Sequence, residues 1–298
     1  MRLTHPALNH PQCQRLHQRN DMNPENPSAI IKIASVQMVS SPDVEENLNT
    51  ASKLVRLAAE DGAQVIVLPE YFCLMGLHDT DKLAIKERFG KGPIQDRLAT
   101  IAQENAIYLV AGTIPLESIQ ANKVLNTTLI YSPEGKCIGR YDKIHLFGFA
   151  TPTERYEESQ TIEAGHQPQR FSLELNGVEW QFGLSICYDL RFPELYRALG
   201  AVDCHLIPAA FTYTTGKEHW EILLRARAIE NQCYVLASAQ GGSHQNKRRT
   251  WGHSMLIDPW GSILGDLPEG EGFVSGTLSK DTLNAVRSKL PALKHRKL

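Results

Sequence analysis

Three side chains that could act together in acyl transfer each lie at or near the end of an apolar segment. Glu70 ends "VIVLPE", Lys143 lies in "GRYDKIHLF", and Cys187 lies in "GLSICYDLRFPEL". A cysteine sulfur can attack a carbonyl carbon, a carboxylate can take up the thiol proton, and an ammonium can stabilise the oxyanion. Together these residue types predict amide hydrolysis through a thioester.

The thiol of Cys187 needs partners for this chemistry, because a lone buried cysteine is more often a small core residue. We expect Lys143 and the start of a helix over 192–201 to favour the thiolate, since both place positive charge near the sulfur. We also expect the backbone N–H of Tyr188 to help Lys143 hold the oxyanion.

The first half of the chain alternates apolar strand patterns with helical periodicity. Strands are predicted over 29–37, 64–70 and 107–115. A helix over 47–63 separates the first two, and a helix that begins at Pro93 precedes the third. This β-α-β-α-β order places Glu70 at the end of a buried strand.

Two hairpins and further alternation follow. One hairpin turns at 132–135, and the second turns at Asn176-Gly177 and ends its second strand at Cys187. The remaining helices are predicted over 192–201, 218–232 and 281–290, and two further strands over 204–210 and 234–240. The pattern predicts an α/β protein whose mixed sheets are covered by helices, with two layers of each.

Composition limits the other classes of function. The chain has 298 residues, is 42% hydrophobic and carries a formal charge of −2, which gives no reason to expect nucleic acid as a partner. No apolar run is long enough to cross a membrane. We interpret residues 1–28 as a disordered extension, with Met22 as an alternative start, and residues 29–298 as one domain. Six scattered cysteines without a Cys-x-x-Cys pair favour a cytoplasmic location.

In this order, the three segments resemble the catalytic signatures of the nitrilase superfamily, the carbon-nitrogen hydrolases, and the likeness extends over 31–290. The resemblance implies an α-β-β-α sandwich, a homodimer or higher homo-oligomer, and no metal or organic cofactor. It makes Glu70 the general base, Lys143 the electrostatic stabiliser and Cys187 the nucleophile.

The family pattern also includes a second glutamate that supports catalysis. Matching "YEESQTIEAG" to the pattern places it at Glu158, with Glu157 as the alternative. The sequence departs from the pattern nearby, because Gly148 stands where related amidases often have an aspartate.

Segments 208–240 and 252–261 resemble the nitrilase-like amidase branch, which includes ω-amidase and deaminated-glutathione amidase. The implied activity is hydrolysis of the terminal amide of a small carboxylic or α-keto acid, with water as co-substrate and ammonia or an amine as product. A nitrilase or an N-carbamoyl or β-ureido hydrolase of the same superfamily is the alternative. A second alternative is that the protein is a non-catalytic scaffold.

Substrate recognition is expected to need a cation if the substrate carries a carboxylate. Arg191 is the candidate, because a guanidinium binds a carboxylate through two hydrogen bonds, and an ion pair at the helix start is its alternative role. Phe211, Thr215 and Trp220 are candidate pocket residues, with core packing as their alternative. We interpret the basic cluster 247–249 as a solvated loop.

The histidines show no spacing that favours a cysteine–histidine dyad. We expect His145 and His205 to be hydrogen-bonded structural residues and His219 to support the site indirectly. The adjacent pair Cys204-His205 does not predict a zinc site, because neighbouring residues on a strand point to opposite faces. We expect Cys233 to lie in the core.

Overall fold

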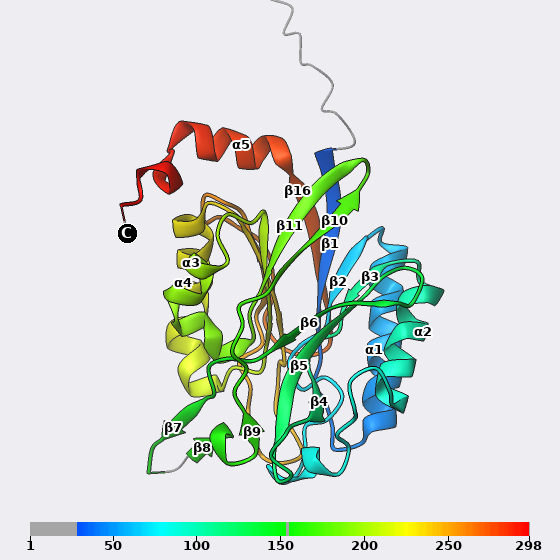
Figure 1. Ribbon diagram of the computed structural model, residues 1–298. Helices are drawn as coiled ribbons and strands as arrows, with labels where there is room; N and C mark the ends of the chain where they lie inside the picture. The colour runs from blue at the N-terminus through cyan, green and yellow to red at the C-terminus, as the bar shows by residue number, and fades with distance from the viewer. Residues whose placement is uncertain (1–28, 153–154, 298) are drawn as a thin grey trace, which may run out of the picture.

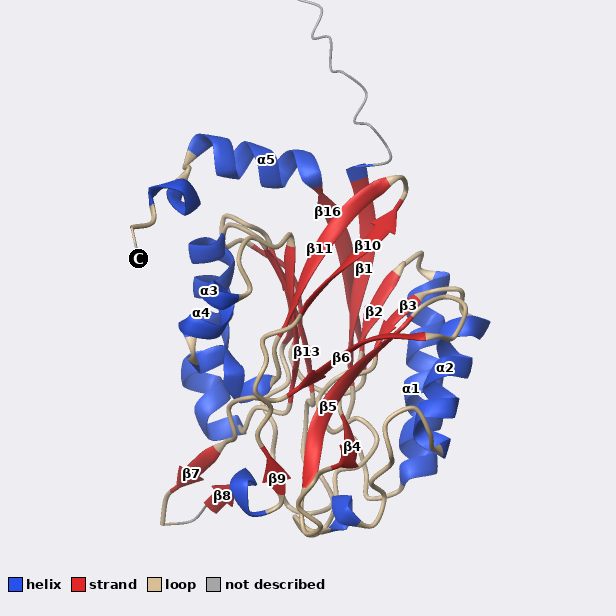
Figure 2. Cartoon of the chain, viewed as in Figure 1, coloured by secondary structure: helices blue, strands red, loops and turns tan. Residues whose placement is uncertain are grey.

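Two packed β-sheets form the centre of the molecule, and helices cover their outer faces (Figure 1). The computed structural model describes residues 29–152 and 155–297. The extension expected over residues 1–28 lies outside the described residues. The four layers confirm the predicted α-β-β-α architecture (Figure 2).

The first sheet has eight strands and is covered by two helices. Its main path is β16-β1-β2-β3-β5-β4, and β6 and β9 both pair with β5. The strands, in chain order, are β1 (Ile30–Gln37), β2 (Val65–Val67), β3 (Tyr108–Val110), β4 (Ile114–Glu117), β5 (Val124–Tyr131), β6 (Cys137–Asp142), β9 (Ile162–Glu163) and β16 (Gly272–Ser279). The covering helices are α1 (Val44–Glu60) and α2 (Pro93–Glu104).

The second sheet has six strands in the order β10-β11-β12-β13-β14-β15. They are β10 (Arg170–Leu175), β11 (Val178–Leu184), β12 (Cys204–Ala209), β13 (Tyr234–Ala239), β14 (Ser254–Ile257) and β15 (Ile263–Leu267). Helices α3 (Pro193–Ala198) and α4 (Tyr213–Asn231) cover it, and α5 (Lys280–Lys289) lies across one end of the sheets. The short strands β7 (Gly148–Ala150) and β8 (Arg155–Glu157) form a separate hairpin.

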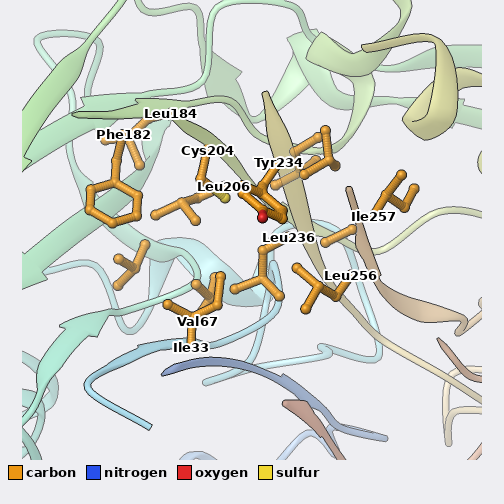
Figure 3. Close-up of a cluster of buried hydrophobic side chains, with 14 of the residues drawn as sticks. Ile33, Val67, Phe182, Leu184, Cys204, Leu206, Tyr234, Leu236, Leu256 and Ile257 are labelled. Atoms are coloured by element: carbon orange, nitrogen blue, oxygen red, sulfur yellow. The ribbon is translucent and has the colours of Figure 1, made fainter. Parts of the chain in front are cut away.

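Apolar side chains from both sheets meet in one core. Ile33 and Val67 from the first sheet face Leu206 and Leu236 from the second (Figure 3). All four side chains are buried, so strands that are distant in sequence are held together mainly by the removal of apolar surface from water.

Helix α1 shows how local sequence sets an element. The carboxylate of Asp43 accepts a hydrogen bond from the backbone N–H of Glu46 at 2.9 Å and caps the first turn. The predicted apolar positions are all buried, and Gly62 follows the helix with φ of 92°, a conformation that suits glycine. The apolar face of α1 therefore packs on the first sheet, as the helical spacing of its apolar residues predicts.

Strand directions bring the ends of several strands to one edge. Strands β1, β2 and β3 are parallel to one another, and β5 is antiparallel to both β3 and β6, so β6 runs in the direction of β2. In the second sheet, β11, β12 and β13 are parallel. The residues that follow β2, β6, β11 and β12 are therefore positioned to converge.

Several predicted boundaries differ from the structure: the strand predicted over 107–115 is two strands, β3 and β4, and two further differences lie near Cys187 and Thr212. Strand β11 ends at Leu184, and Cys187 begins a short 3-10 helix, η4 (Cys187–Arg191), instead of ending the strand. Helix α4 begins at Tyr213 instead of residue 218, because the hydroxyl of Thr212 accepts a hydrogen bond from the N–H of Thr215 and caps an earlier turn. Both predicted hairpins are confirmed.

No helix among residues 29–152 and 155–297 is long and apolar enough to cross a membrane.

Candidate active site

Glu70, Lys143 and Cys187 lie together where the two sheets meet. Lys143 directly follows β6, and its Nζ lies 2.8 Å from Oε1 of Glu70, which follows β2. Cys187 lines the same pocket as Glu70. All three side chains are buried, so a carboxylate, an ammonium and a thiol share a site with little access to bulk water.

Glu158, and not Glu157, joins this group. Nζ of Lys143 lies 2.9 Å and 2.8 Å from the two carboxylate oxygens of Glu158, which begins the 3-10 helix η3 (Glu158–Gln160). The carboxylate of Glu157 accepts hydrogen bonds from Arg155 and Gln160. Among the described residues, Lys143 forms ion pairs with Glu70 and Glu158 and not with Glu157. The geometry therefore favours Glu158 between the two glutamates of the sequence.

Four further donors, among them the backbone N–H of Phe147, which donates to Oε2 of Glu158 at 2.7 Å, hold the carboxylates of Glu70 and Glu158 in place. Nδ2 of Asn126 donates to Oε1 of Glu70 at 2.9 Å, and the backbone N–H of Ala210 donates to Oε2 at 3.0 Å. Tyr71 donates its hydroxyl proton to Oε1 of Glu158 at 2.7 Å. Sequence analysis missed Tyr71 and Asn126, although Tyr71 directly follows Glu70.

The charges in this group explain the directions in which the pKa values move. Burial raises the pKa of Glu70 and outweighs the opposite effect of Lys143. Burial also acts to raise the pKa of Glu158, but the ammonium of Lys143 outweighs it and lowers the pKa below 4.5. Burial alone would lower the pKa of Lys143, yet the two carboxylates raise it well above 10.5. Lys143 is therefore held charged.

The thiol of Cys187 differs from the prediction of a resting thiolate. Burial and the negative charge of Glu70 raise its pKa well above 9.0, and the opposing effect of Lys143 is smaller. The helix contribution is also small, since α3 has six residues and begins at Pro193, beyond η4. The prediction was wrong because it included the nearby cation but not the effect of burial, or of the negative charge of Glu70, on the pKa of the thiol. Glu70 is placed to accept the thiol proton as the sulfur attacks.

A buried aspartate fixes the turn that presents Cys187. Oδ2 of Asp189 accepts hydrogen bonds from the N–H of Ile186 at 2.9 Å and from the hydroxyl of Tyr141 at 2.7 Å. Oδ1 lies 2.7 Å from Nδ1 of His145, which confirms the structural role expected for that histidine. Cys187 itself has φ of 49°, a left-handed conformation that is uncommon without glycine and that these bonds hold.

A pocket that includes Cys187 is lined by cations that the sequence did not predict to lie at the site. Its wall includes Lys82, Phe147, Tyr156, Arg248 and Arg249, in addition to the buried acids. The basic cluster 247–249 is a loop with Lys247 and Arg249 exposed, as expected, but Arg248 and Arg249 also line this pocket, which the interpretation as a solvated loop did not include. The loop that follows β13 contributes Arg248 and Arg249 to the pocket. Its position depends on contacts between segments 169 residues apart, such as the ion pair between Arg248 and Asp79.

A smaller pocket adjoins Cys187 and contains three of the predicted substrate residues. Tyr188, Phe211 and Thr215 line it. Trp220 does not, because it is fully buried beneath Phe211, with ring centroids 4.8 Å apart, and donates its Nε1 proton to a backbone carbonyl. The structure therefore supports the alternative role of Trp220, packing in the core.

Arg191 lines neither pocket. Its guanidinium lies 5.8 Å from the ring centroid of Tyr188 and 5.7 Å from that of Phe211. Nη2 lies 3.1 Å from Nδ1 of His219, so its nearest polar partner is a histidine and not the acid that the alternative role predicted. Arg191 therefore lies near two aromatic residues that line the smaller pocket, but it does not line that pocket itself.

His205 differs from its predicted hydrogen-bonded state. Both ring nitrogens are buried without a hydrogen-bond partner among the described residues, and burial lowers the pKa of His205 to about 3. Cys233 is fully buried, as expected for a core residue. Across the described ranges, no cluster of three or more histidine, cysteine or acidic side chains forms a metal-binding group.

Comparison with known proteins supports a common fold and chemistry. The model of the carbon-nitrogen hydrolase family matches residues 32–288. A deaminated glutathione amidase from Synechocystis sp. (strain PCC 6803 / GT-S) is 43% identical over 268 residues, which are 88% of this chain and 97% of that protein. Omega-amidase NIT2 of Xenopus tropicalis is 35% identical over 90% of this chain and 96% of its own length.

A solved structure agrees with these relatives. The crystal structure of Saccharomyces cerevisiae Nit3, a member of branch 10 of the nitrilase superfamily, superposes with a TM-score of 0.80 at 30% identity and covers 91% of this chain and 97% of that one.

Proposed function

The chain belongs to the carbon-nitrogen hydrolase family and hydrolyses carbon–nitrogen bonds, and from this premise we propose that it is an amidase acting on the terminal amide of a small α-keto acid. Deaminated glutathione and α-ketoglutaramate are the proposed substrates, and the names of the two amidase relatives support this choice. The observation that carries the mechanism is the buried cluster of Glu70, Lys143, Glu158 and Cys187.

The first half-reaction forms a thioester. As Sγ of Cys187 attacks the amide carbon, its proton passes to Glu70, whose raised pKa suits it to accept and return protons. Lys143 and the N–H of Tyr188 stabilise the oxyanion. Glu70 then protonates the amide nitrogen, the carbon–nitrogen bond breaks, and ammonia or an amine leaves.

The second half-reaction returns the enzyme to its starting state. Glu70 takes a proton from water, the resulting hydroxide attacks the thioester carbon, and the carbon–sulfur bond breaks to release the acid and the thiolate of Cys187. Proton return from Glu70 restores the thiol. Glu158 keeps Lys143 charged and oriented throughout, because it accepts two hydrogen bonds from the same ammonium.

A substrate panel tests this function. The purified chain is incubated with α-ketoglutaramate, deaminated glutathione, an N-carbamoyl amino acid and an aromatic nitrile, and release of 2-oxoglutarate or ammonia is measured. We expect turnover of one or both keto-acid amides. Turnover of the nitrile or the carbamoyl compound alone would contradict the amidase assignment and favour the alternative chemistries of the family.

We also propose that the chain works as a homodimer in the cytoplasm. Ile222 and Ile229 are exposed and lie two turns apart on α4, and Trp260, which shortly precedes β15 in sequence, is exposed as well. These exposed apolar side chains support an apolar contact surface. The five cysteines within the described ranges are free, which fits a reducing compartment. Light scattering after gel filtration and cell fractionation test the two statements.

A further inference from the structure

Lys82 is a partly buried cation on the wall of the Cys187 pocket, and no carboxylate of the described residues forms an ion pair with it. It lies in the short 3-10 helix η2 (Asp81–Leu83). Its Nζ donates to the hydroxyl of Thr161 at 3.2 Å and lies 5.6 Å from the ring centroid of Tyr71. A hydroxyl and an aromatic ring replace only part of the hydration that an ammonium loses on burial.

Arg248 stands beside Lys82 and adds a second cation. Both side chains line the Cys187 pocket and the small hollow that adjoins it. Arg248 pairs with Asp79 and faces the ring of Tyr156 at 5.1 Å. Burial lowers the pKa of Lys82; the charges of Glu158 and Asp79 act to raise it, and those of Arg248 and Lys143 act to lower it. Lys82 and Arg248 therefore repel one another across the pocket wall.

The other charged side chains of this wall already have partners. Arg249 pairs with Glu269, and Glu157 pairs with Arg155. Glu158 is engaged by Lys143. Asp79 is shared with Arg248 and Glu158 with Lys143, and although both carboxylates act to raise the pKa of Lys82, burial outweighs them. A bound anion would relieve both the repulsion between the cations and the incomplete solvation of Lys82.

On the basis of the proposed amidase function, we infer that Lys82 and Arg248 form a carboxylate-binding subsite that selects amides carrying a free acid group. This assigns to the loop cations the task that sequence analysis gave to Arg191, which lies outside both pockets. The acid group belongs either to the acyl part of the substrate or to its leaving amine, and matched substrates separate these two sources.

The test compares Lys82→Met and Arg248→Met with the unaltered chain on two acid–neutral pairs. α-Ketoglutaramate and its methyl ester differ in the acyl carboxylate, whereas deaminated glutathione and its C-terminal carboxamide differ in the carboxylate of the leaving amine. For at least one pair, we expect each variant to lower kcat/KM for the acid about tenfold or more, mainly through KM, and to change the neutral compound much less.

Lys86→Met is the matched control, because Lys86 lies four residues from Lys82 and its Nζ donates to the carbonyl of Ala121 away from the pocket. It should leave both pairs unchanged. Equal losses for acid and neutral substrates in the Lys82 and Arg248 variants would mean a structural role only and would overturn the subsite. Unchanged discrimination in both variants would overturn it as well.

A binding measurement separates this inference from the proposed function. The Cys187→Ala protein and the Cys187→Ala/Lys82→Met double variant are each titrated calorimetrically with 2-oxoglutarate and with cysteinylglycine, the products from the two sides of the amide. Loss of binding of either product on substitution supports the subsite even if no amide is hydrolysed. Amide turnover with product binding that is insensitive to Lys82→Met refutes the subsite and leaves the amidase intact.

Discussion

Nζ of Lys143 lies 2.8 Å from Oε1 of Glu70, although 73 residues separate them in sequence. The same ammonium bridges to Glu158, so one positive charge serves two buried carboxylates. Since each member changes the protonation of the others, substitutions within the cluster are expected to have effects that do not add.

Replacement of the nucleophile should remove activity and preserve the fold. Cys187→Ala is expected to reduce hydrolysis of the best substrate by at least about a thousandfold, because no other thiol is assigned to the attack. Cys137→Ser is the control, since Cys137 is an exposed free cysteine on β6. Steady-state kinetics and circular dichroism check both variants. Substantial turnover by Cys187→Ala would contradict the thioester mechanism.

The two adjacent glutamates should respond differently to the same change. Glu158→Gln removes a charge that holds Lys143, and we expect kcat to fall about a hundredfold or more. Glu157→Gln alters an exposed ion pair with Arg155, and such pairs have little energetic weight, so its kcat should stay within about twofold. A larger loss in Glu157→Gln than in Glu158→Gln would reverse the assignment made from the structure.

The pH profile should report the raised pKa of Glu70. Glu70 must be ionised to accept the thiol proton, so kcat/KM is expected to fall as the pH falls through a value above the ordinary 4.5 of a glutamate. Removing the hydrogen bond from Asn126 to Oε1 destabilises the carboxylate, so Asn126→Leu should move this limb to still higher pH. An acid limb below 4.5 in the unaltered chain would exclude Glu70 as the titrating base.

The alkaline limb should depend on Lys82 before Lys143. The pKa of Lys82 is lowered from 10.5, whereas that of Lys143 is raised well above 10.5. Carboxylate binding is therefore expected to weaken at high pH while the charge of Lys143 persists, which appears as a rise in KM before a fall in kcat. The Lys82→Met variant should lack this rise. A rise of equal size in that variant would assign the alkaline limb to another group.

His205 should make the folded state sensitive to mild acid. Its pKa falls from 6.5 to about 3 on folding, so between these values the unfolded chain binds more protons and stability decreases as the pH is lowered. One such proton changes the free energy of unfolding by up to about 1.4 kcal/mol per pH unit. His205→Leu should flatten this slope, as measured by urea unfolding across the window. An unchanged slope would show that other groups cause it.

Much of the fold was accessible from local patterns. The apolar stripe of α1 and the turn at Asn176-Gly177 depend on neighbours in sequence, and both were predicted correctly. The turn at Cys187 was not, because its left-handed conformation is held by Asp189 through contacts with Tyr141 and His145, more than 40 residues away. The residue pattern of a short segment cannot predict contacts with residues so distant in sequence.

The sequence by itself predicted most of the order of strands and helices and proposed Glu70, Lys143 and Cys187 as the catalytic residues, because residue type and position near the end of an apolar segment are properties of short segments. Only the tertiary structure decided between Glu158 and Glu157, raised the pKa of the Cys187 thiol through burial, and placed Lys82 and Arg248 rather than Arg191 on the pocket wall. Protonation and pocket charge depend on burial and on distances between remote segments, and these exist only after the two sheets have packed together.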